Sequence, residues 1–323
     1  MIAFLLRRAA HTLVVVAAVA TLVFVLIHAA PGDPFAGSLD NPNVTEEVRA
    51  RWRASYGLDQ PLPTQYGRYL ARLARGDLGW SFSRQQPVSA VIRDSLPRTL
   101  LLVGLALALA FAAGIAVALA QTRRRGRLFD RVAGGVSLVL LSIPDFWLGL
   151  LLLLAFSYWI PLFPVGGMTD AVVYPHLGAG AKLLDRAHHI VLPLATLVLA
   201  AGAAVARYQR AALLDVLPRD YIRSARAKGV EERAVVRRHA LRNALMPSIT
   251  LLGTSLPALV GGVVFVEKVF SWPGMGLVAV DAVSSRDYPL VLAVVIVGTI
   301  VVALGNLLAD VLYRVADPRL RDA

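Results

Sequence analysis

Residues 215–247 read DVLPRDYIRSARAKGVEERAVVRRHALRNALMP, a charged segment that lies between two long apolar runs. Together with the two arginines just before it, the segment carries ten Lys/Arg against four acids. Residues 221–228 are rich in helix formers and stop at Gly229, the residue type that most readily takes the left-handed conformation after a helix. A second helix over 231–245 would have an apolar stripe on one side and most of its arginines off that stripe. We therefore expect this basic segment (215–247) to form two short helices that offer a docking surface to a molecule in water.

The apolar runs are long enough to cross a membrane. The chain has 323 residues, 57% of them apolar, and its mean hydropathy of +0.63 is too high for one soluble domain. Six runs reach the length of about 20 residues that one crossing needs: 9–30, 97–121, 132–160, 190–212, 246–266 and 288–312. They predict an all-α fold, a polytopic membrane protein with six transmembrane helices. The first run is longer than the core of a signal peptide, so we interpret it as an anchor.

The positive charge is concentrated on one side of the predicted membrane protein. If the N-terminus is inside, the interior pieces hold twenty Lys/Arg and eight acids, whereas the exterior pieces hold twelve of each. The net charge of +12 therefore falls on the inner side. This positive-inside bias predicts that both termini are cytoplasmic. Nucleic acid is not an expected partner, because the basic stretch has only Tyr208 and Tyr221 among its charges to stack on bases.

The runs divide the chain into four predicted regions. These are an N-terminal transmembrane helix (1–30), an external segment (31–95), a transmembrane core (96–313) that contains the basic segment, and a cytoplasmic tail (314–323). Within the external segment we expect one helix over 46–56 and a second over 65–75, the second ended by Gly76.

No motif for catalysis or nucleotide binding is present. The sequence has no GxxxxGKS or GxxxxGKT, no HExxH and no GxSxG pattern, and no cysteine, so we expect no enzymatic activity, no cofactor and no metal site. The neighbouring His188 and His189 would point about 100° apart on a helix, which makes a poor metal-binding pair. Energy for transport must then come from a separate ATPase at the cytoplasmic face or from ion-coupled groups in the membrane.

Two acids stand out in or near the predicted spans. Asp145, just after Pro144, lies near the middle of a run, where a charge costs about 2.5–3.5 kcal/mol. It either faces an aqueous pathway or has a structural role, and the residues favour neither. Glu267 lies nearer the outer end of another run, where we favour a hydrated carboxylate paired with Lys268.

Alternatives from other classes remain open on the residues alone. A secondary transporter would need several intramembrane charges, and an intramembrane enzyme would need a second catalytic group beside Asp145. The arginine-rich face over 233–242 suits anionic lipid as well as protein. The break at Gly229 and the acids Glu231 and Glu232 favour a protein partner.

Eight short motifs, in order along almost the whole chain, carry a resemblance to a known family. They are PGDP (31–34), GLDQP (57–61), RGDLGWS (75–81), IPDFWLG (143–149), DYIRSARAKG (220–229), RHALRNALMP (238–247), EKVFSWPGMG (267–276) and DPRLR (317–321). With these motifs the chain resembles the permease subunits of ABC importers of the dipeptide and oligopeptide group, which also includes nickel and glutathione systems. PGDP and the long outer segment make it similar to the first of the two permeases that such systems pair.

The resemblance implies a type I ABC importer permease, non-catalytic itself, that forms half of a translocation pore in the cytoplasmic (inner) membrane of a bacterium or archaeon. A second, homologous permease would complete the pore. Two cytoplasmic ATP-binding subunits would dock on the basic segment, and an external solute-binding protein would deliver the solute, for which peptide is expected. Membrane lipid is the remaining expected partner.

The family's ATPase-coupling signature is a Glu-Ala-Ala run followed by a glycine. Here Arg223, Ser224 and Ala225 take the aligned positions, so the Glu is absent, whereas Gly229 is in place. The expected ATPase-coupling residues are Asp220, Tyr221, Arg223, Ala225, Lys228, Gly229, Glu231, Glu232 and Arg233. The expected residues of the translocation pathway or outer gate are Asp145, Glu267, Phe270 and Trp272. In the outer loop, Trp272 is expected to contact the binding protein or the entering peptide.

Overall fold

A computed structural model describes residues 2–29, 47 and 60–316, and this part of the chain is almost wholly helical. The predicted all-α fold class is therefore confirmed. The helix predicted over 46–56 lies outside the described residues, apart from residue 47. The helix predicted over 65–75 is confirmed, and Gly76 follows it with a positive φ of +75°.

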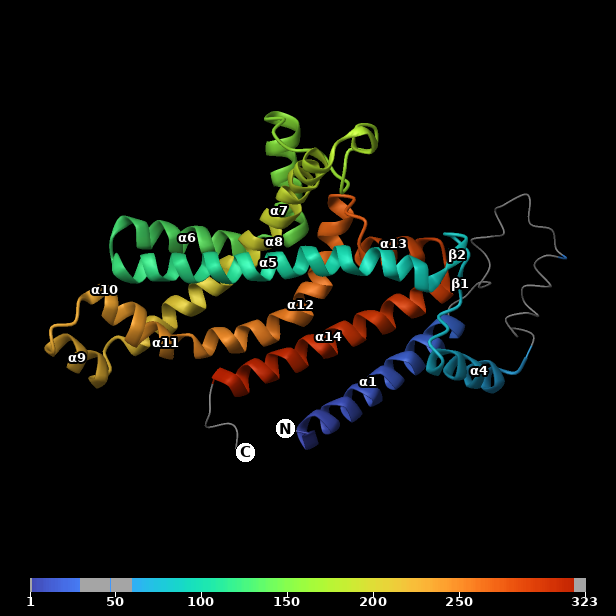
Figure 1. Ribbon diagram of the computed structural model, residues 1–323, viewed down its shortest axis with the longest axis horizontal. Coiled ribbons are helices and arrows are strands. Elements are labelled where there is room, and N and C mark those ends of the chain that lie inside the picture. The colour runs from blue at the N-terminus through green and yellow to red at the C-terminus, as the bar shows by residue number, and fades with distance from the viewer. Residues whose placement is uncertain (1, 30–46, 48–59, 317–323) are drawn as a thin grey trace. The chain divides into compact units, whose positions relative to one another are not determined.

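The helices fall into five long ones and a set of shorter elements (Figure 1). The long helices are α1 (Ile2–Ala29), α5 (Val88–Arg123), α8 (Ala179–Val216), α12 (Met246–Val269) and α14 (Tyr288–Ala316). The shorter helices are α4 (Leu62–Ala74), α6 (Leu128–Ser142), α7 (Asp145–Leu153), α9 (Asp220–Ala227), α10 (Glu232–Ala234), α11 (Leu241–Ala244) and α13 (Met275–Ser284). The other elements are two π-helical turns, η1 (Leu154–Trp159) and η3 (Val235–Ala240), a 3₁₀ turn, η2 (Tyr174–His176), and the antiparallel strands β1 (Trp80–Ser81) and β2 (Gln86–Pro87).

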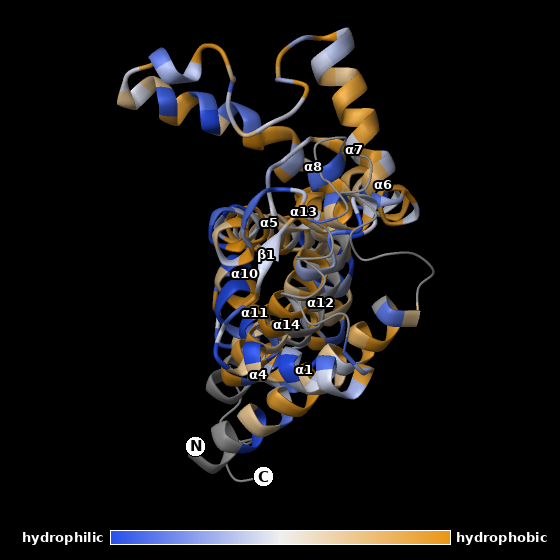
Figure 2. Cartoon of the chain, turned by 90° about the vertical axis from the view of Figure 1, so that its right-hand side faces the viewer, coloured by the Kyte–Doolittle hydropathy of each residue, from blue (hydrophilic) through white to orange (hydrophobic). Residues whose placement is uncertain are grey.

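Four described helices are unbroken and apolar enough to cross a membrane: Arg7–Leu26 within α1, all of α5, all of α8, and Tyr288–Val311 within α14. The helix α12 occupies the run predicted over 246–266. The remaining run, 132–160, is divided between α6 and α7. Figure 2 shows that hydrophobic residues predominate along α7.

The run 132–160, predicted as one span, is not one continuous helix. The chain bends by 107° between α6 and the helix that begins at Asp145. The cause is Pro144, which lacks a backbone N–H and forces the residue before it out of helical geometry. Ile143 accordingly has extended backbone angles, φ −92° and ψ 127°. Asp145 therefore lies in the first turn of a new helix rather than in the middle of one.

Two helices extend well beyond the apolar runs that predicted them. The helix α5 begins at Val88 rather than near 97, with Pro97 inside it, and α8 begins at Ala179 rather than near 190. Hydropathy detects the part of a helix that is apolar, and it does not detect polar turns that continue the helix beyond the membrane. The segments that precede these two apolar runs are consequently more helical than expected.

The chain divides into two compact units. The first unit is Met1–Thr99 with Pro273–Ala303, and the second is Leu100–Trp272 with Leu304–Ala323. In the second unit, α8 lies against α6, α7 and α12 (Figure 1). Gly114 of α5 allows a close approach to α8, because an added Cβ would lie 2.7 Å from Val205 Cβ and 2.8 Å from the Gly202 carbonyl oxygen. Small residues at such crossings let the helix backbones pack closely.

Candidate functional site

The basic segment folds as two short helical pieces joined at Gly229, as predicted. Gly229 has a φ of +76°, and its N–H donates to the Arg226 carbonyl oxygen at 3.0 Å. The next N–H, of Val230, reaches the Ala225 carbonyl oxygen at 3.3 Å. These two bonds satisfy carbonyl groups at the end of α9, which is the usual role of a left-handed residue there. The second piece, α10 to α11, differs from the prediction because the π-helical turn η3 interrupts it.

One face of the two pieces is apolar and packs on the long helices of the second unit. Ile222, Val235 and Ala240 are completely buried, in one cluster with Ala118 of α5 and Leu213 of α8. The wide turn of η3 buries the consecutive residues 235 and 236 together. Burial of this apolar face fixes the basic segment to α5 and α8.

Polar contacts hold the two pieces to each other across Gly229. The guanidinium of Arg226 donates to both carboxylate oxygens of Glu232, at 2.9 and 2.7 Å. Asn243 Nδ2 donates to the Tyr221 hydroxyl at 2.9 Å, which joins α11 to α9. The hydrogen bond from Arg226 lowers the pKa of the Glu232 carboxyl. The two pieces are therefore held in a defined orientation.

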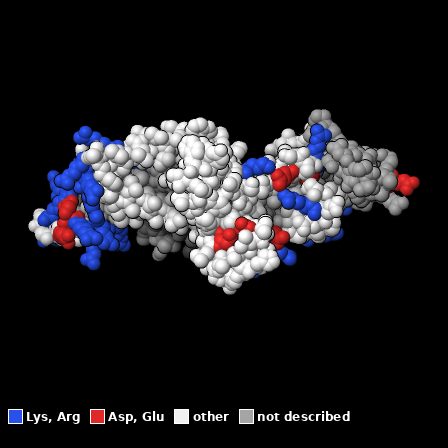
Figure 3. Space-filling view, turned by 90° about the horizontal axis from the view of Figure 1, so that it is seen from above, with Lys and Arg blue, Asp and Glu red and all other residues white. Residues whose placement is uncertain are grey.

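The other face of the segment is exposed and carries both signs of charge (Figure 3). Arg223 is paired with Asp220 on this face, and the two side chains are 73% and 88% exposed. Eight of the nine expected coupling positions lie on it: Asp220, Tyr221, Arg223, Lys228, Gly229, Glu231, Glu232 and Arg233. The ninth, Ala225, is buried at 7% exposure and supports the surface from beneath.

Sequence reasoning missed a buried polar connection between the basic segment and the spans. Gln209 of α8 is fully buried, and its Nε2 donates to the Ala244 carbonyl oxygen at 3.0 Å. Its Oε1 accepts from the Ser248 hydroxyl at the start of α12. Gln209 thus ties α8 to α11 and α12. The sequence feature that could have indicated this contact is the polar amide side chain of Gln209 at the end of a largely apolar run.

The next residue along α8 makes a second missed connection, on another side. Arg210 Nε and Nη2 donate to the Asp130 carboxylate at 2.8 and 2.9 Å, and Asp130 is only 7% exposed. Asp130 also accepts from the Gly126 N–H at 3.0 Å, so it fixes the turn before α6. Asp130 was recognisable as the one acid in the basic stretch 122–131. The bidentate geometry is the strong form of such a pair.

The residues expected at the outer gate lie mostly inside the core of the second unit. Glu267, Phe270 and Trp272 are 0%, 1% and 1% exposed, and the two aromatic residues belong to one buried apolar cluster. The favoured interpretation of Glu267 as a hydrated carboxylate is therefore wrong, because the fold covers it. Asp145 is half-buried at the start of α7.

The loop that contains Gly166 and Gly167, before α8, packs on the buried Phe270. The Gly167 N–H donates to the Phe270 carbonyl oxygen at 2.8 Å, and a Cβ at Gly166 would lie 2.7 Å from the same oxygen. From the other side, Gly149 of α7 approaches the Phe270 ring. A close backbone contact therefore requires glycine at position 166.

No group of three or more His, Asp or Glu that could hold a metal ion occurs within the described ranges. His188 Nε2 bonds to the Leu162 carbonyl oxygen at 2.6 Å, and His189 Nδ1 to the Asp185 carbonyl oxygen at 2.8 Å. The two imidazoles therefore use different partners.

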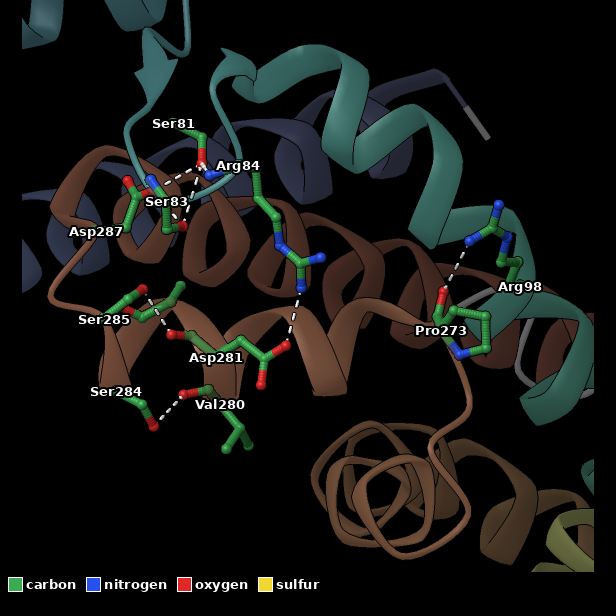
Figure 4. Close-up of polar contacts among 11 residues, drawn as sticks. Ser81, Ser83, Arg84, Arg98, Pro273, Val280, Asp281, Ser284, Ser285 and Asp287 are labelled. Atoms are coloured by element: carbon green, nitrogen blue, oxygen red, sulfur yellow. Dashed lines mark hydrogen bonds and ion pairs between the residues drawn. The ribbon is translucent and has the colours of Figure 1, made fainter. Parts of the chain in front are cut away.

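In the first unit, the β1–β2 hairpin is fastened to α13 and α14 by one buried carboxylate (Figure 4). Asp287, 2% exposed, accepts at Oδ2 from the Ser81 hydroxyl at 2.6 Å, the Ser83 hydroxyl at 2.7 Å and the Ser83 N–H at 2.9 Å. Arg84 pairs with Asp281 at 2.9 Å. The RGDLGWS motif thus ends in a rigid hairpin that leaves Trp80 43% exposed.

Two protein-family models together match almost the whole chain. The model of the binding-protein-dependent transport system inner membrane component matches residues 102–322, and the model of the N-terminal part of such membrane components matches residues 1–103. Among solved structures, the chain resembles the inward-facing MetNI methionine ABC transporter, with a TM-score of 0.54 and 18% identity over 71% of this chain and 97% of that chain. That likeness shows the fold, the type I importer permease fold.

Curated relatives agree with the family models. The oligopeptide transport system permease protein AppB of Bacillus subtilis is 39% identical, covering 99% of both chains. The glutathione permease GsiC of Salmonella typhimurium is 38% identical, and the di/tripeptide permease DppB of Pseudomonas aeruginosa is 37% identical, each with 99% of both chains covered. This chain therefore belongs to the family of binding-protein-dependent transport system inner membrane components, and it is a non-catalytic membrane permease subunit of an ABC importer.

Proposed function

We propose that this permease imports short peptides, together with a second permease, two cytoplasmic ATP-binding subunits and an external solute-binding protein. The names of the relatives support the solute class: oligopeptides, di- and tripeptides, and glutathione, which is itself a tripeptide. A peptide backbone and its charged ends are the chemistry common to all three. Nickel is the alternative solute.

The exposed face of the basic segment is the docking surface for an ATP-binding subunit. The observation that carries this proposal is the division of the segment into an apolar face buried on α5 and α8 and a charged face open to a partner. An element that is rigid and anchored on one side can transmit a displacement applied to the other. Arg223 replaces the family's Glu and contributes a cation to the partner.

The displacement reaches the spans through α8. Gln209 joins this helix to α11 and α12, and Arg210 joins it to Asp130 before α6. Breaking a buried hydrogen-bonded contact leaves a desolvated polar group, which costs about 1–3 kcal/mol. The helices α6, α8, α11 and α12 consequently move together rather than independently.

The positive-inside bias supports a cytoplasmic position for the basic segment and both termini. The four regions keep their sequence assignments, with residues 1–30 as the first span, 31–95 external, 96–313 as the permease core and 314–323 as the cytoplasmic tail. In this orientation Glu267, Phe270 and Trp272 close the outer end of α12 by packing, and Asp145 faces the solute pathway. Opening of the gate would expose Trp272 to the entering peptide.

Reconstitution of the full complex tests the proposed function. Proteoliposomes that contain both permeases and the ATP-binding subunits, with binding protein outside and ATP inside, should accumulate labelled di- and tripeptides. Omission of either ATP or the binding protein should abolish accumulation. Accumulation of nickel without peptide would contradict the solute class, and accumulation by this permease alone would contradict the mechanism.

The docking surface has its own test within the same complex. Arg233→Glu should reduce co-purification of the ATP-binding subunits, because it reverses one charge on the exposed face. Arg75→Glu, in the segment assigned to the outside, is the matched control and should leave the complex intact. Equal co-purification of the two variants would contradict docking at this face.

A further inference from the structure

The first unit contains a cavity of about 150 Å³ between the end of α1, the helix α4 and the first turns of α14. Its wall is mainly apolar and includes Phe24, Leu73, Leu292 and Ile296. Phe24 also contacts the ring of Tyr69, with centroids 5.5 Å apart, so α1 and α4 are packed together at this point.

One polar group in the cavity wall lacks a partner. The Tyr69 hydroxyl is buried and has no hydrogen-bond partner, and an orphaned buried hydroxyl is costly unless a ligand satisfies it. Burial, with a smaller contribution from Tyr66, raises the pKa of Tyr69 to about 12. The phenol is therefore protonated at neutral pH and offers a donor.

Two arginines of α4 also line the cavity. Arg68 and Arg72 are four residues apart, so they lie on the same side of the helix. Arg68 is exposed and Arg72 is half-buried. His28 and Asp77 of the wall also have partners within the chain: His28 Nε2 bonds to Gln65 at 3.2 Å, and Asp77 accepts from the Gly79 N–H at 3.0 Å.

The two spans that border the cavity are mostly exposed within this chain. Only 11% of the apolar window of α1 and 17% of that of α14 is buried. On α1, the exposed Leu22, Val25 and Leu26 precede His28 and lead along the helix to the cavity. A cavity at the end of such spans lies near the headgroup level of a bilayer, where guanidinium groups meet lipid phosphates.

We infer that this cavity binds an anionic phospholipid, with a phosphate at Arg68 and Arg72, an oxygen of the lipid at the Tyr69 hydroxyl, and part of an acyl chain against Phe24, Leu292 and Ile296. A cavity near 150 Å³ holds a benzene-sized group. It therefore takes only part of the acyl chain, and the remainder stays in the bilayer along α1 and α14. This role is separate from solute transport and does not depend on the nature of the solute.

Lipid retention by the full complex tests the site. The complex is released from nanodiscs of equal phosphatidylglycerol and phosphatidylcholine, and bound lipid is counted by native mass spectrometry. The wild type should retain phosphatidylglycerol in preference. Arg68→Gln and Tyr69→Phe should each reduce that retention by about tenfold, because a hydrogen bond to a charged group contributes that much to binding. Arg75→Gln removes a charge from the end of the same helix outside the cavity and should retain the wild-type amount.

A photoreactive phosphatidylglycerol with its probe in the acyl chain provides the second measurement. It should label the peptide that contains Leu292 and Ile296, and unlabelled phosphatidylglycerol should compete. Melting midpoints of the variants show whether they fold. Wild-type retention by folded Arg68→Gln, equal retention of the two lipids, or labelling only at other sites would each overturn the inference.

Discussion

At the scale of single residues, Gly229 tests the proposed coupling directly. Its φ of +76° is unfavourable for a β-branched side chain, by about 1–2 kcal/mol, whereas an added Cβ would meet no atom within 4 Å. The effect of Gly229→Val is therefore confined to the backbone. We expect this variant to insert and assemble but to lose solute uptake while the complex still hydrolyses ATP.

The matched variant is Gly229→Asn, because asparagine tolerates the left-handed conformation. It should retain most uptake in the same proteoliposomes. Equal solute uptake by the Gly229→Val and Gly229→Asn variants would show that the left-handed turn has no part in coupling.

The Arg226–Glu232 pair predicts a small dependence of stability on pH. The folded chain lowers the pKa of Glu232 below its ordinary value of 4.5, with the hydrogen bond from Arg226 as the main cause. The pair therefore contributes stability above pH 4.5, and this contribution disappears as the pH falls through the lowered pKa. Because the side chains are 40% and 61% exposed, we expect Glu232→Gln to cost less than about 1 kcal/mol at pH 7.

Melting midpoints of the purified permease at several pH values measure this effect. The difference between wild type and Glu232→Gln should be present at pH 7 and shrink at acidic pH. Glu231→Gln removes the same charge one position away and leaves the two hydrogen bonds from Arg226 in place. A difference that grows on acidification would contradict the assigned sign.

At the scale of helices, the crossing of α5 and α8 depends on Gly114. Alanine at this position would bring Cβ within 2.7 Å of Val205 and force the helices apart. Overpacking of this kind costs about 1–3 kcal/mol. Gly114→Ala should lower the yield and melting midpoint of the permease in detergent, whereas Gly104→Ala on the same helix, where no atom lies within 4 Å, should not. Similar midpoints for the two variants would show that the crossing can relax.

The elements that were predicted correctly are those whose signal is local. The signal comes from residues close together in the sequence for the helix ends at Gly229 and Gly76 and for the long apolar runs. The break between α6 and α7 also had a local cause, Pro144, but a continuous apolar run on both sides concealed it. Local chemistry was therefore sufficient to predict the basic segment and its turn at Gly229.

The elements that were missed depend on residues far apart in the sequence. Asp287 is buried by Ser81 and Ser83, about two hundred positions away, and Glu267 looked hydrated because its position near the end of a span says nothing about what covers it. Gln209 likewise acquires its role only when α11 and α12 are in place. No periodicity or composition encodes such contacts.

At the scale of the whole molecule, the placement of charge predicts the orientation in the membrane. The twenty Lys/Arg of the interior pieces must lie in the cytoplasm if the positive-inside bias holds. The chain has no cysteine, so single cysteines report position without background. Ser224→Cys on α9 and Ser284→Cys on α13 are both exposed in the fold and occupy opposite predicted sides.

An impermeant maleimide applied to intact spheroplasts should label Ser284→Cys and spare Ser224→Cys. Inverted vesicles should give the reverse. Both serines are exposed in the fold, and the permease is expressed without its ATP-binding subunits so that none covers Ser224; a difference in labelling then reports the side of the membrane. Labelling of Ser224→Cys from outside would place the basic segment on the side of the membrane away from cytoplasmic ATP. A subunit that hydrolyses cytoplasmic ATP cannot reach a surface on that side, so this result would remove the physical basis for ATPase docking.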